Sequence, residues 1–266
     1  MTDQIKQRIK AGQNQHQQFN LLRNELQCLI LQEIDRHQGF DKMVFVGGTA
    51  LRILFDLDRF SEDLDFSLSS LVKDKFDLVA LMQNICETIN NFGIFCEVKK
   101  PRAIMAVHGC FLSFKTQEFI ASKELKQTLA VKVEIDTNPP RGGVEQISSV
   151  KGPRLFKVRH YDLPSLFAGK LHALLFRKYT KGRDLYDYLW YLARKVSPNL
   201  TLLENGILQT QKLKLKLDAQ NLKELLTKRF AQIDFAKAKE DLRPFVFDEN
   251  SLSLFTPQIF FNSFPT

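Results

Sequence analysis

The sequence predicts an α+β fold with two lobes, a mixed β-sheet core lobe followed by a helical C-terminal lobe. Apolar residues recur at helical spacing within residues 1–38, which predicts a helical start. Strand-like alternation dominates the middle of the chain, and from Leu163 onward the pattern is helical again. Strands and helices that are separated along the chain are typical of α+β architecture. We therefore expect two domains, at 1–160 and 161–266.

Local patterns predict the individual elements. Met43–Val46 is a short apolar run that ends at Gly47-Gly48, which predicts a buried strand entering a tight turn. Thr49 is suited to cap a short helix that reaches Leu54. The Pro139-Pro140 and Gly142-Gly143 pairs predict a loop. Further strands are expected at 63–68, 94–99, 104–115, 129–136 and near 155–160, and further helices at 74–92, 163–178, 184–195, 199–216 and 218–230.

Composition limits the class of protein. The formal net charge of +8 favours an anionic partner such as nucleic acid or a nucleotide, although charge alone fits a protein without such a partner equally well. The four Cys sit among apolar neighbours with no zinc-type spacing, which predicts reduced core residues. The polar first twenty residues predict no signal peptide, and no apolar run is long enough to span a bilayer. We expect a cytoplasmic protein with no membrane partner.

Two acidic side chains form the first candidate site. Asp63 and Asp65 lie two apart on a predicted strand, so both point to one face, about 7 Å apart at their Cα atoms. Such a pair repels itself unless a cation lies between the carboxylates, and Mg²⁺ (or Mn²⁺) prefers oxygen ligands together with substrate phosphates. Gly47-Gly48, followed by Thr49, lets a backbone approach phosphate closely, and Ser61 offers a hydroxyl. A solvated strand face is the alternative for an isolated Asp-x-Asp.

The order of these residues resembles a known family. The segments Val46-Gly47-Gly48-Thr49-Ala50-Leu51 and Arg59-Phe60-Ser61-Glu62-Asp63-Leu64-Asp65-Phe66 are similar to the first motif of the AbiEii/AbiGii-type nucleotidyltransferase toxins. That family belongs to the DNA polymerase β-like nucleotidyltransferase superfold. The resemblance reaches from about residue 43 to about residue 195. It implies that Asp63 and Asp65 hold a catalytic metal.

A second acidic pair lies on a later strand. Glu134 and Asp136 share the polar face of an alternating run, where a third acid would hold a second cation or deprotonate the attacking hydroxyl. An edge strand with a polar face is an equal alternative from this segment alone. The run from Glu134 to Pro140 resembles a segment of many family members, and the superfold places its third carboxylate on such a strand. We favour Glu134, with Asp136 close behind.

The third candidate group lies in the helical part of the chain. Lys170 and Arg177 are seven apart on one predicted helix face, and the apolar neighbours of Lys170 favour an ammonium aimed at an anion such as a triphosphate. A snorkelling surface lysine is the alternative. Asp184 stands where a helix N-cap belongs, and Asp187 is suited to pair with Arg183 or Arg177. The resemblance implies a phosphate-binding Lys170 and an Asp184 that completes the site.

The resemblance also implies a function. We expect a metal-dependent nucleotidyltransferase toxin that transfers a nucleoside monophosphate from a nucleoside triphosphate to an RNA acceptor such as tRNA, and that a cognate antitoxin protein restrains. Transfer to a protein or small-molecule hydroxyl is the first alternative. A catalytically silent nucleotide- or RNA-binding module is the second, and the paired acids argue against it. The Phe-rich tail at 252–264 is expected to pack back onto the body, with an antitoxin contact as the alternative.

Overall fold

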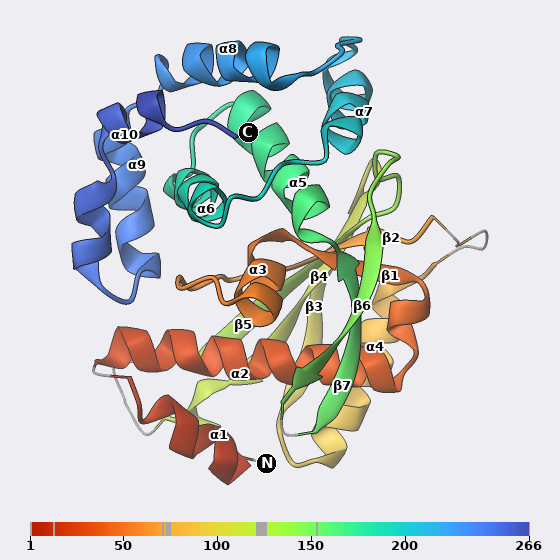
Figure 1. Cartoon of the computed structure of the whole chain (residues 1–266). Helices are drawn as coiled ribbons and strands as arrows, with labels where there is room; N and C mark the ends of the chain where they lie inside the picture. The colour runs from red at the N-terminus through yellow and green to blue at the C-terminus, as the bar shows by residue number, and fades with distance from the viewer. Residues whose placement is uncertain are drawn as a thin grey trace. The chain divides into compact units, whose positions relative to one another are not determined.

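The structure is a computed structural model that describes residues 2–12, 14–70, 72, 76–120, 127–152 and 154–265. These residues form a seven-stranded mixed sheet and the helices α1 to α10, which confirms the α+β expectation (Figure 1). They separate into two compact units. The sheet unit consists of Met1–Phe55, Phe60–Asn138 and Gln146–His160, and the helical unit of Asp56–Arg59, Pro139–Glu145 and Tyr161–Thr266.

The strands follow the order β3-β4-β5-β2-β1-β7-β6 across the sheet. Strand β2 runs antiparallel to β1 and parallel to β5, and β4 runs antiparallel to both β5 and β3. The strands are β1 (Met43–Val46), β2 (Leu64–Leu68), β3 (Cys96–Ile104), β4 (Val107–Lys115), β5 (Thr128–Asp136), β6 (Glu145–Lys151) and β7 (Leu155–Tyr161).

One face of the sheet carries the core of the sheet unit. Leu64 and Phe66 on β2 and Val133 and Ile135 on β5 are paired in register and buried. Helix α4 (Leu78–Asn91) packs against β3 and β4 and against α2 (Gln15–Arg36), while α3 (Gly47–Phe55) packs against β1 and β2. Because side chains alternate along a strand, the residues between these apolar ones are presented on the opposite face.

Two expected elements of the sheet unit differ from those observed. The helix expected over 1–38 is two helices, α1 (Thr2–Ile9) and α2, because Asn14 accepts a hydrogen bond from the Gln17 N–H and starts a new helix. The expected loop after Gly143 contains β6 instead. None of the residues of β6 is buried, so the strand has no apolar alternation that the sequence could have revealed.

Six helices, with short 3₁₀ turns, account for the regular structure described in the helical unit: α5 (Leu163–Phe176), α6 (Gly182–Ala193), α7 (Leu200–Gln211), α8 (Ala219–Phe230), α9 (Phe235–Leu242) and α10 (Pro257–Asn262). Helix α5 packs against α6, α7 and α8, and α6 packs against α9. Helix α7 ends five residues before the expected boundary at 216, because Lys212 adopts a left-handed conformation with φ of 59°.

The Phe-rich tail packs back onto the helical unit, as expected. Phe260 is fully buried and contacts the rings of Tyr188, Phe230 and Phe255. The Tyr188 hydroxyl also donates to the backbone carbonyl of Ser263 at 2.7 Å. The tail therefore completes a core that it shares with α6 and α8.

The expected domain division at 160/161 stays a prediction, because compactness alone does not show that either part folds by itself. No described helix is long and apolar enough to cross a membrane.

Candidate active site

A row of paired residues crosses the sheet unit on the face opposite its core. Val46 pairs with Asp65, Asp65 with Glu134, Glu134 with Gly109, and Gly109 with Arg102. Residues that are paired directly across strands project on the same face. The sheet therefore presents two acids, a glycine and an arginine side by side in one line.

Gly47 leaves room for the first acid of this row. Its φ is +80°, and a Cβ atom at this position would lie 2.5 Å from Oδ2 of Asp65. Any other residue would therefore be strained in its backbone and would collide with the carboxylate. Gly47 begins α3 directly after β1, so the chain turns into the helix against Asp65.

Asp63 lies immediately before β2, so the strand begins one residue later than the strand expected at 63–68. The buried Thr49 hydroxyl donates to the Asp63 backbone carbonyl at 2.5 Å. The expected capping role of Thr49 is wrong, because α3 already begins at Gly47. The backbone carbonyl of Ser61 accepts a hydrogen bond from the Gln27 side chain at 3.2 Å. This contact fixes the backbone two residues before Asp63.

Glu134 lies between two basic side chains. Lys132 forms an ion pair with its Oε2 at 2.5 Å, and Arg102 forms a short ion pair with its Oε1. Burial by itself raises the pKa of Glu134, but the hydrogen bonds and charges of Lys132 and Arg102 outweigh burial and lower it. The carboxylate is therefore held ionised, as a metal ligand or a proton acceptor needs to be.

Asp136 lies further from the first acid pair. It is paired with Ser67, two residues along β2 from Asp65, and its Oδ1 accepts the Asn138 N–H at 2.9 Å. Burial raises the pKa of Asp136, and the Asn138 hydrogen bond offsets only part of that effect. Of the two acids left open by the sequence, Glu134 is the one aligned with Asp65.

Carboxylate oxygens such as those of Asp63 and Asp65 suit a hard cation that the substrate phosphates also bind. In the part of the chain that the structure describes, no three His, Cys, Asp or Glu side chains converge as a ready metal cage. Mg²⁺ usually binds through one or two carboxylates plus waters and substrate phosphates. Asp63 and Asp65 supply the carboxylate oxygens that this kind of site requires, so the residues fit the ion.

The helical unit contains a buried network of charges. The Arg59 guanidinium donates to both carboxylate oxygens of Asp187, at 2.7 and 2.6 Å. Lys170 Nζ lies 2.7 Å from Asp187 Oδ2 and 3.3 Å from Asp184 Oδ1. Arg177 forms a short ion pair with Asp184. Three basic groups thus contact two acids in this buried network.

The partners of Asp187 differ from those expected. Asp187 pairs with Arg59 and Lys170, whereas the sequence suggested Arg183 or Arg177. Burial by itself raises the pKa of Asp187, but the adjacent charges of Arg59 and Lys170 outweigh burial and lower it. Arg59 and Asp187 are 128 residues apart, so no local pattern could have joined them. The only sequence signal was the position of Arg59 inside the first motif.

Two further interpretations change with this network. Asp184 is not the N-cap of α6, because the helix begins at Gly182 and Lys181 holds the cap position. The Asp184 side chain instead binds Arg177 and Lys170. Lys170 is largely buried and does not snorkel, because its ammonium lies on two carboxylates. The expected contact between Lys170 and phosphate stays a prediction.

Comparison with known proteins identifies the family. The family described as Nucleotidyl transferase AbiEii toxin, Type IV TA system, matches residues 29–258, which is most of the chain. The chain belongs to this AbiEii family. It is therefore a nucleotidyltransferase of a toxin family from type IV toxin–antitoxin systems, and the family resemblance expected from the sequence motifs is confirmed. An antitoxin partner and a nucleoside triphosphate substrate follow at the level of the AbiEii family.

Solved structures from Helicobacter pylori share the fold. A candidate nucleotidyltransferase is 20% identical with a TM-score of 0.53, and the match covers 91% of this chain and 94% of that one. JHP933 is also 20% identical with a TM-score of 0.53, and the match covers 91% of this chain and 92% of that one. No curated protein sequence matches this AbiEii chain significantly.

Proposed function

We propose that this AbiEii protein is a metal-dependent enzyme of the cytoplasm that transfers a nucleoside monophosphate from a nucleoside triphosphate to an RNA acceptor such as tRNA. The observation that carries the proposal is the alignment of Asp65 with Glu134, with Asp63 two residues before Asp65 and Gly47 packed against Asp65. This arrangement supports metal-assisted phosphoryl transfer, because oxygen ligands lie beside a backbone that a phosphate can approach closely.

In this proposal the three carboxylates have separate roles. Asp63 and Asp65 hold Mg²⁺ or Mn²⁺, which polarises the α-phosphate when bound. Glu134 accepts the proton of the acceptor hydroxyl or holds a second cation, and Asp136 is the alternative for that role. The hydroxyl oxygen forms a bond to the α-phosphorus, the bond from the α-phosphorus to the bridging oxygen breaks, and pyrophosphate leaves.

The remaining candidates bind the donor nucleotide. We assign the turn at Gly47-Gly48, with Thr49 and Ser61, to the phosphates. Lys170 and Arg177 neutralise charge that develops on the leaving pyrophosphate, and Asp184 keeps both cations in place through its ion pairs with them. The positive charges of Lys170 and Arg177 support this assignment, since a triphosphate is strongly anionic.

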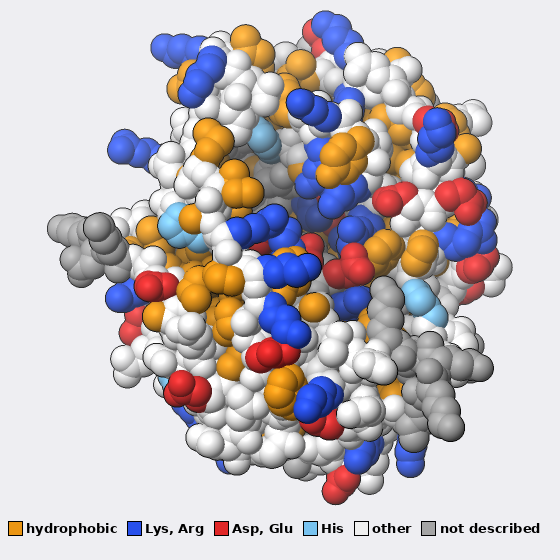
Figure 2. Space-filling view, turned by 180° about the vertical axis from the view of Figure 1, so that it is seen from behind, with side chains coloured by type: hydrophobic (Ala, Val, Ile, Leu, Met, Phe, Trp, Pro, Cys, Tyr) orange, Lys and Arg blue, Asp and Glu red, His pale blue; other side chains and the backbone are white. Residues whose placement is uncertain are grey.

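The charge of the protein favours a nucleic-acid acceptor. The formal net charge is +8. Figure 2 shows Lys and Arg side chains over much of the visible face, with Asp and Glu side chains among them. A basic surface of this kind attracts a polyanion and raises its local concentration.

The test is transfer of label from each α-labelled nucleoside triphosphate to total RNA or to protein extract, with Mg²⁺, with Mn²⁺ and with a chelator. We expect label in tRNA only when metal is present, and more than about a hundredfold loss in Asp65→Asn, because the metal loses a charged ligand. Asp41→Asn changes an exposed carboxylate of the sheet unit and should leave transfer unchanged.

Other results would revise the proposal. Label in a polypeptide or a small molecule would replace RNA as the acceptor. Full transfer by Asp65→Asn would show that Asp65 is not a ligand of a catalytic metal. Nucleotide or RNA binding without transfer, for every nucleotide and metal, would favour the catalytically silent module.

A further inference from the structure

The outer strand β3 contains an irregularity beside the carboxylate row. Lys99 pairs with Phe111, but the next pair joins Arg102 to Gly109, so β3 advances three residues while β4 advances two. The extra residue is a β-bulge, and within it Lys100 has a φ of 49°. Bulges of this kind re-aim side chains and occur frequently beside active sites.

The bulge decides which residue meets Glu134. With regular pairing, Pro101 would stand opposite Gly109; the extra residue puts Arg102 there instead. Gly109 has no side chain, and a Cβ atom on it would lie 2.9 Å from Cγ of Glu134. Arg102 therefore reaches over Gly109 to form its ion pair with Glu134. The left-handed backbone at Lys100 and the absence of a side chain at Gly109 together place the Arg102 guanidinium beside Glu134.

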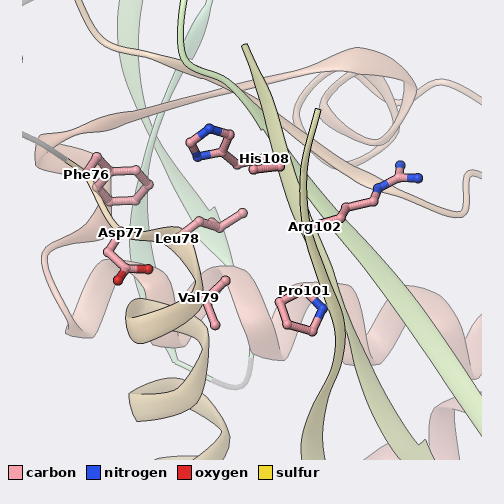
Figure 3. A pocket seen from close by; sticks show the side chains of 8 residues that line it. Phe76, Asp77, Leu78, Val79, Pro101, Arg102 and His108 are labelled. Atoms are coloured by element: carbon pink, nitrogen blue, oxygen red, sulfur yellow. The ribbon is translucent and has the colours of Figure 1, made fainter. Parts of the chain in front are cut away.

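A pocket lies along the same strand. It has a volume of about 530 Å³ and is lined by Phe76, Asp77, Leu78, Val79, Pro101, Arg102, Ala103 and His108. Figure 3 shows the rings of Phe76 and His108 on one side of the β3–β4 hairpin, while the Arg102 side chain points away from them. The hairpin thus has an apolar, ring-lined pocket on one side and a guanidinium directed to the carboxylate row on the other.

The exposed surface of this hairpin combines cations with apolar groups. Lys99, Lys100 and Arg102 are exposed on β3, although Lys99 is partly neutralised by an ion pair with Glu97. At the turn of the hairpin, Met105 is 96% exposed and Ile104 is 59% exposed. Single-stranded nucleic acid binds to surfaces that combine positive charge with aromatic side chains on which bases stack, and the rings available here are those of Phe76 and His108 in the pocket.

We propose that the β3–β4 hairpin and its pocket bind the acceptor strand, a single-stranded RNA end, with one base in the pocket and one phosphate on Arg102. This inference rests on the proposed transfer to RNA. The row supports the contact with Arg102, because Arg102, Gly109, Glu134 and Asp65 lie in one line and the acceptor hydroxyl must arrive at the acids. Strand β3 is the edge of the sheet, so an RNA strand with a base in the pocket would pass round this edge to reach Arg102. Without RNA, Arg102 forms an ion pair with Glu134. When the strand binds, a phosphate pairs with the Arg102 guanidinium instead. The Glu134 carboxylate then becomes available as a proton acceptor or metal ligand.

A nucleic acid fits this surface better than a protein does. The pocket has a volume of about 530 Å³, which is in the range of concave sites that enclose one small ligand or one base. Asp77 in the lining accepts the Ala80 N–H as the cap of α4 and keeps its negative charge. We therefore assign the phosphate to Arg102, whose side chain points away from the rings of the pocket (Figure 3).

Binding of a fluorescent single-stranded RNA of roughly 12 nucleotides, measured without nucleoside triphosphate, tests the proposal. We expect Arg102→Ala and Phe76→Ala each to weaken binding about tenfold. Arg102→Ala should also lower the slope of log affinity against log salt by about 0.7, while Phe76→Ala leaves the slope unchanged, because only Arg102 contacts a phosphate. Arg102→Lys should restore the slope and part of the affinity.

The matched control is Lys151→Ala, which removes an exposed cation from β6, at the opposite edge of the sheet. It should bind RNA like the unaltered protein. Circular dichroism and thermal unfolding of each variant establish that it is folded. Equal loss in Lys151→Ala would indicate non-specific attraction by net charge and would overturn the site.

Four results separate failure of this site from failure of the proposed function. Unchanged RNA binding in both hairpin variants, with transfer to RNA intact in the unaltered protein, overturns the hairpin site alone. Loss of nucleoside triphosphate binding in these variants, with RNA binding retained, reassigns the pocket to the donor nucleotide. Loss of binding to the cognate antitoxin, with RNA binding retained, makes the hairpin a protein-docking surface. Transfer of label only to protein would overturn both the RNA site on the hairpin and the proposed transfer to RNA.

Discussion

Single residues decide the geometry of the acids. Gly47 combines a positive φ with a close approach to Asp65, so two independent reasons exclude a side chain there. Gly93 provides a comparison, because its φ is +77° but no atom lies within 4 Å of the Cβ it would carry. The two glycines share the backbone requirement and differ only in what surrounds them.

Gly47→Ala should therefore lose both stability and activity. The left-handed backbone costs roughly 1–2 kcal/mol for a residue with a Cβ atom. The displacement of Asp65 should lower nucleotide transfer at least about tenfold, because a misplaced catalytic group loses much of its effect. Urea unfolding and the transfer assay measure the two losses.

Gly93→Ala is the matched control, and it should show only the loss of stability caused by the left-handed backbone, with normal transfer. If Gly93→Ala reduced transfer as much as Gly47→Ala, the loss would come from general destabilisation. The close approach of Gly47 to Asp65 would then have no catalytic significance.

Asp187 is the second residue whose surroundings decide its properties. Its side chain is fully buried between Arg59 and Lys170, and these cations hold its pKa below that of an ordinary aspartate. Asp187→Asn should lower the free energy of unfolding by about 3–5 kcal/mol, because it removes the buried negative charge that Asp187 supplies to Arg59 and Lys170. The double variant Arg59→Met/Asp187→Leu should lose much less. Unfolding in urea at pH 7 measures both variants.

The pH dependence of stability follows from the same shift. Because the folded pKa of Asp187 is depressed, its contribution is complete above the unfolded pKa of about 3.9 and is lost as pH falls through the folded value. The unaltered protein should therefore lose more stability than Asp187→Asn between pH 7 and pH 3. An equal loss in both would mean that other carboxylates govern acid unfolding. Glu240→Gln, which alters an exposed ion pair, should behave like the unaltered protein.

At the scale of elements, close contacts between helices depend on glycine. The Cβ that Gly182 lacks would lie 1.9 Å from the Ala238 carbonyl oxygen, so α6 and α9 approach each other backbone to backbone. The Gly182 N–H also donates to Asp241 Oδ2 at 2.8 Å. The start of α6, and with it Asp184 and Asp187, is positioned by this contact with α9.

Gly182→Ala should destabilise the protein by about 1–3 kcal/mol or more, because the added methyl forces the two helices apart. Gly169→Ala in α5 is the control, since no atom lies within 4 Å of its added Cβ. That variant should gain roughly 0.5–1 kcal/mol from its better helix propensity. Thermal unfolding compares the two, and opposite signs are expected. Equal stability of both variants would contradict the tight α6–α9 contact.

At the scale of the whole molecule, the C-terminal tail belongs to the core of the helical unit. Phe260 has no exposed surface and contacts rings from α6, α8 and the tail itself. Phe261, the next residue, is 38% exposed. The chain end is therefore part of the fold that holds Lys170, Asp184 and Asp187.

Phe260→Ala should lower the free energy of unfolding by about 3–5 kcal/mol, as expected for a buried aromatic ring. Phe261→Ala should have a much smaller effect, because that ring already contacts solvent. Calorimetry on both variants measures the difference. If the two losses were the same, the tail would not contribute to the core as the structure indicates.

Much of the fold and of the acid site could be predicted because the evidence is local. Alternation at Glu134 and Asp136 puts that pair on one face of β5, and the same reasoning correctly placed Asp65 on a strand, although Asp63 lies one residue before it. The strand at Met43–Val46 and the glycine turn after it are also readable locally. Elements without an apolar face, such as β6, could not be recognised in this way.

The sequence by itself determined the α+β class, the acid pairs and the family motifs, because periodicity and spacing act over a few residues. Only the tertiary structure decided that Glu134 stands beside Asp65, that a bulge brings Arg102 to Glu134, and that Arg59 neutralises Asp187. These pairings join residues far apart in the chain. Strand register and side-chain burial, which create them, arise only when the whole sheet and the helical core have packed.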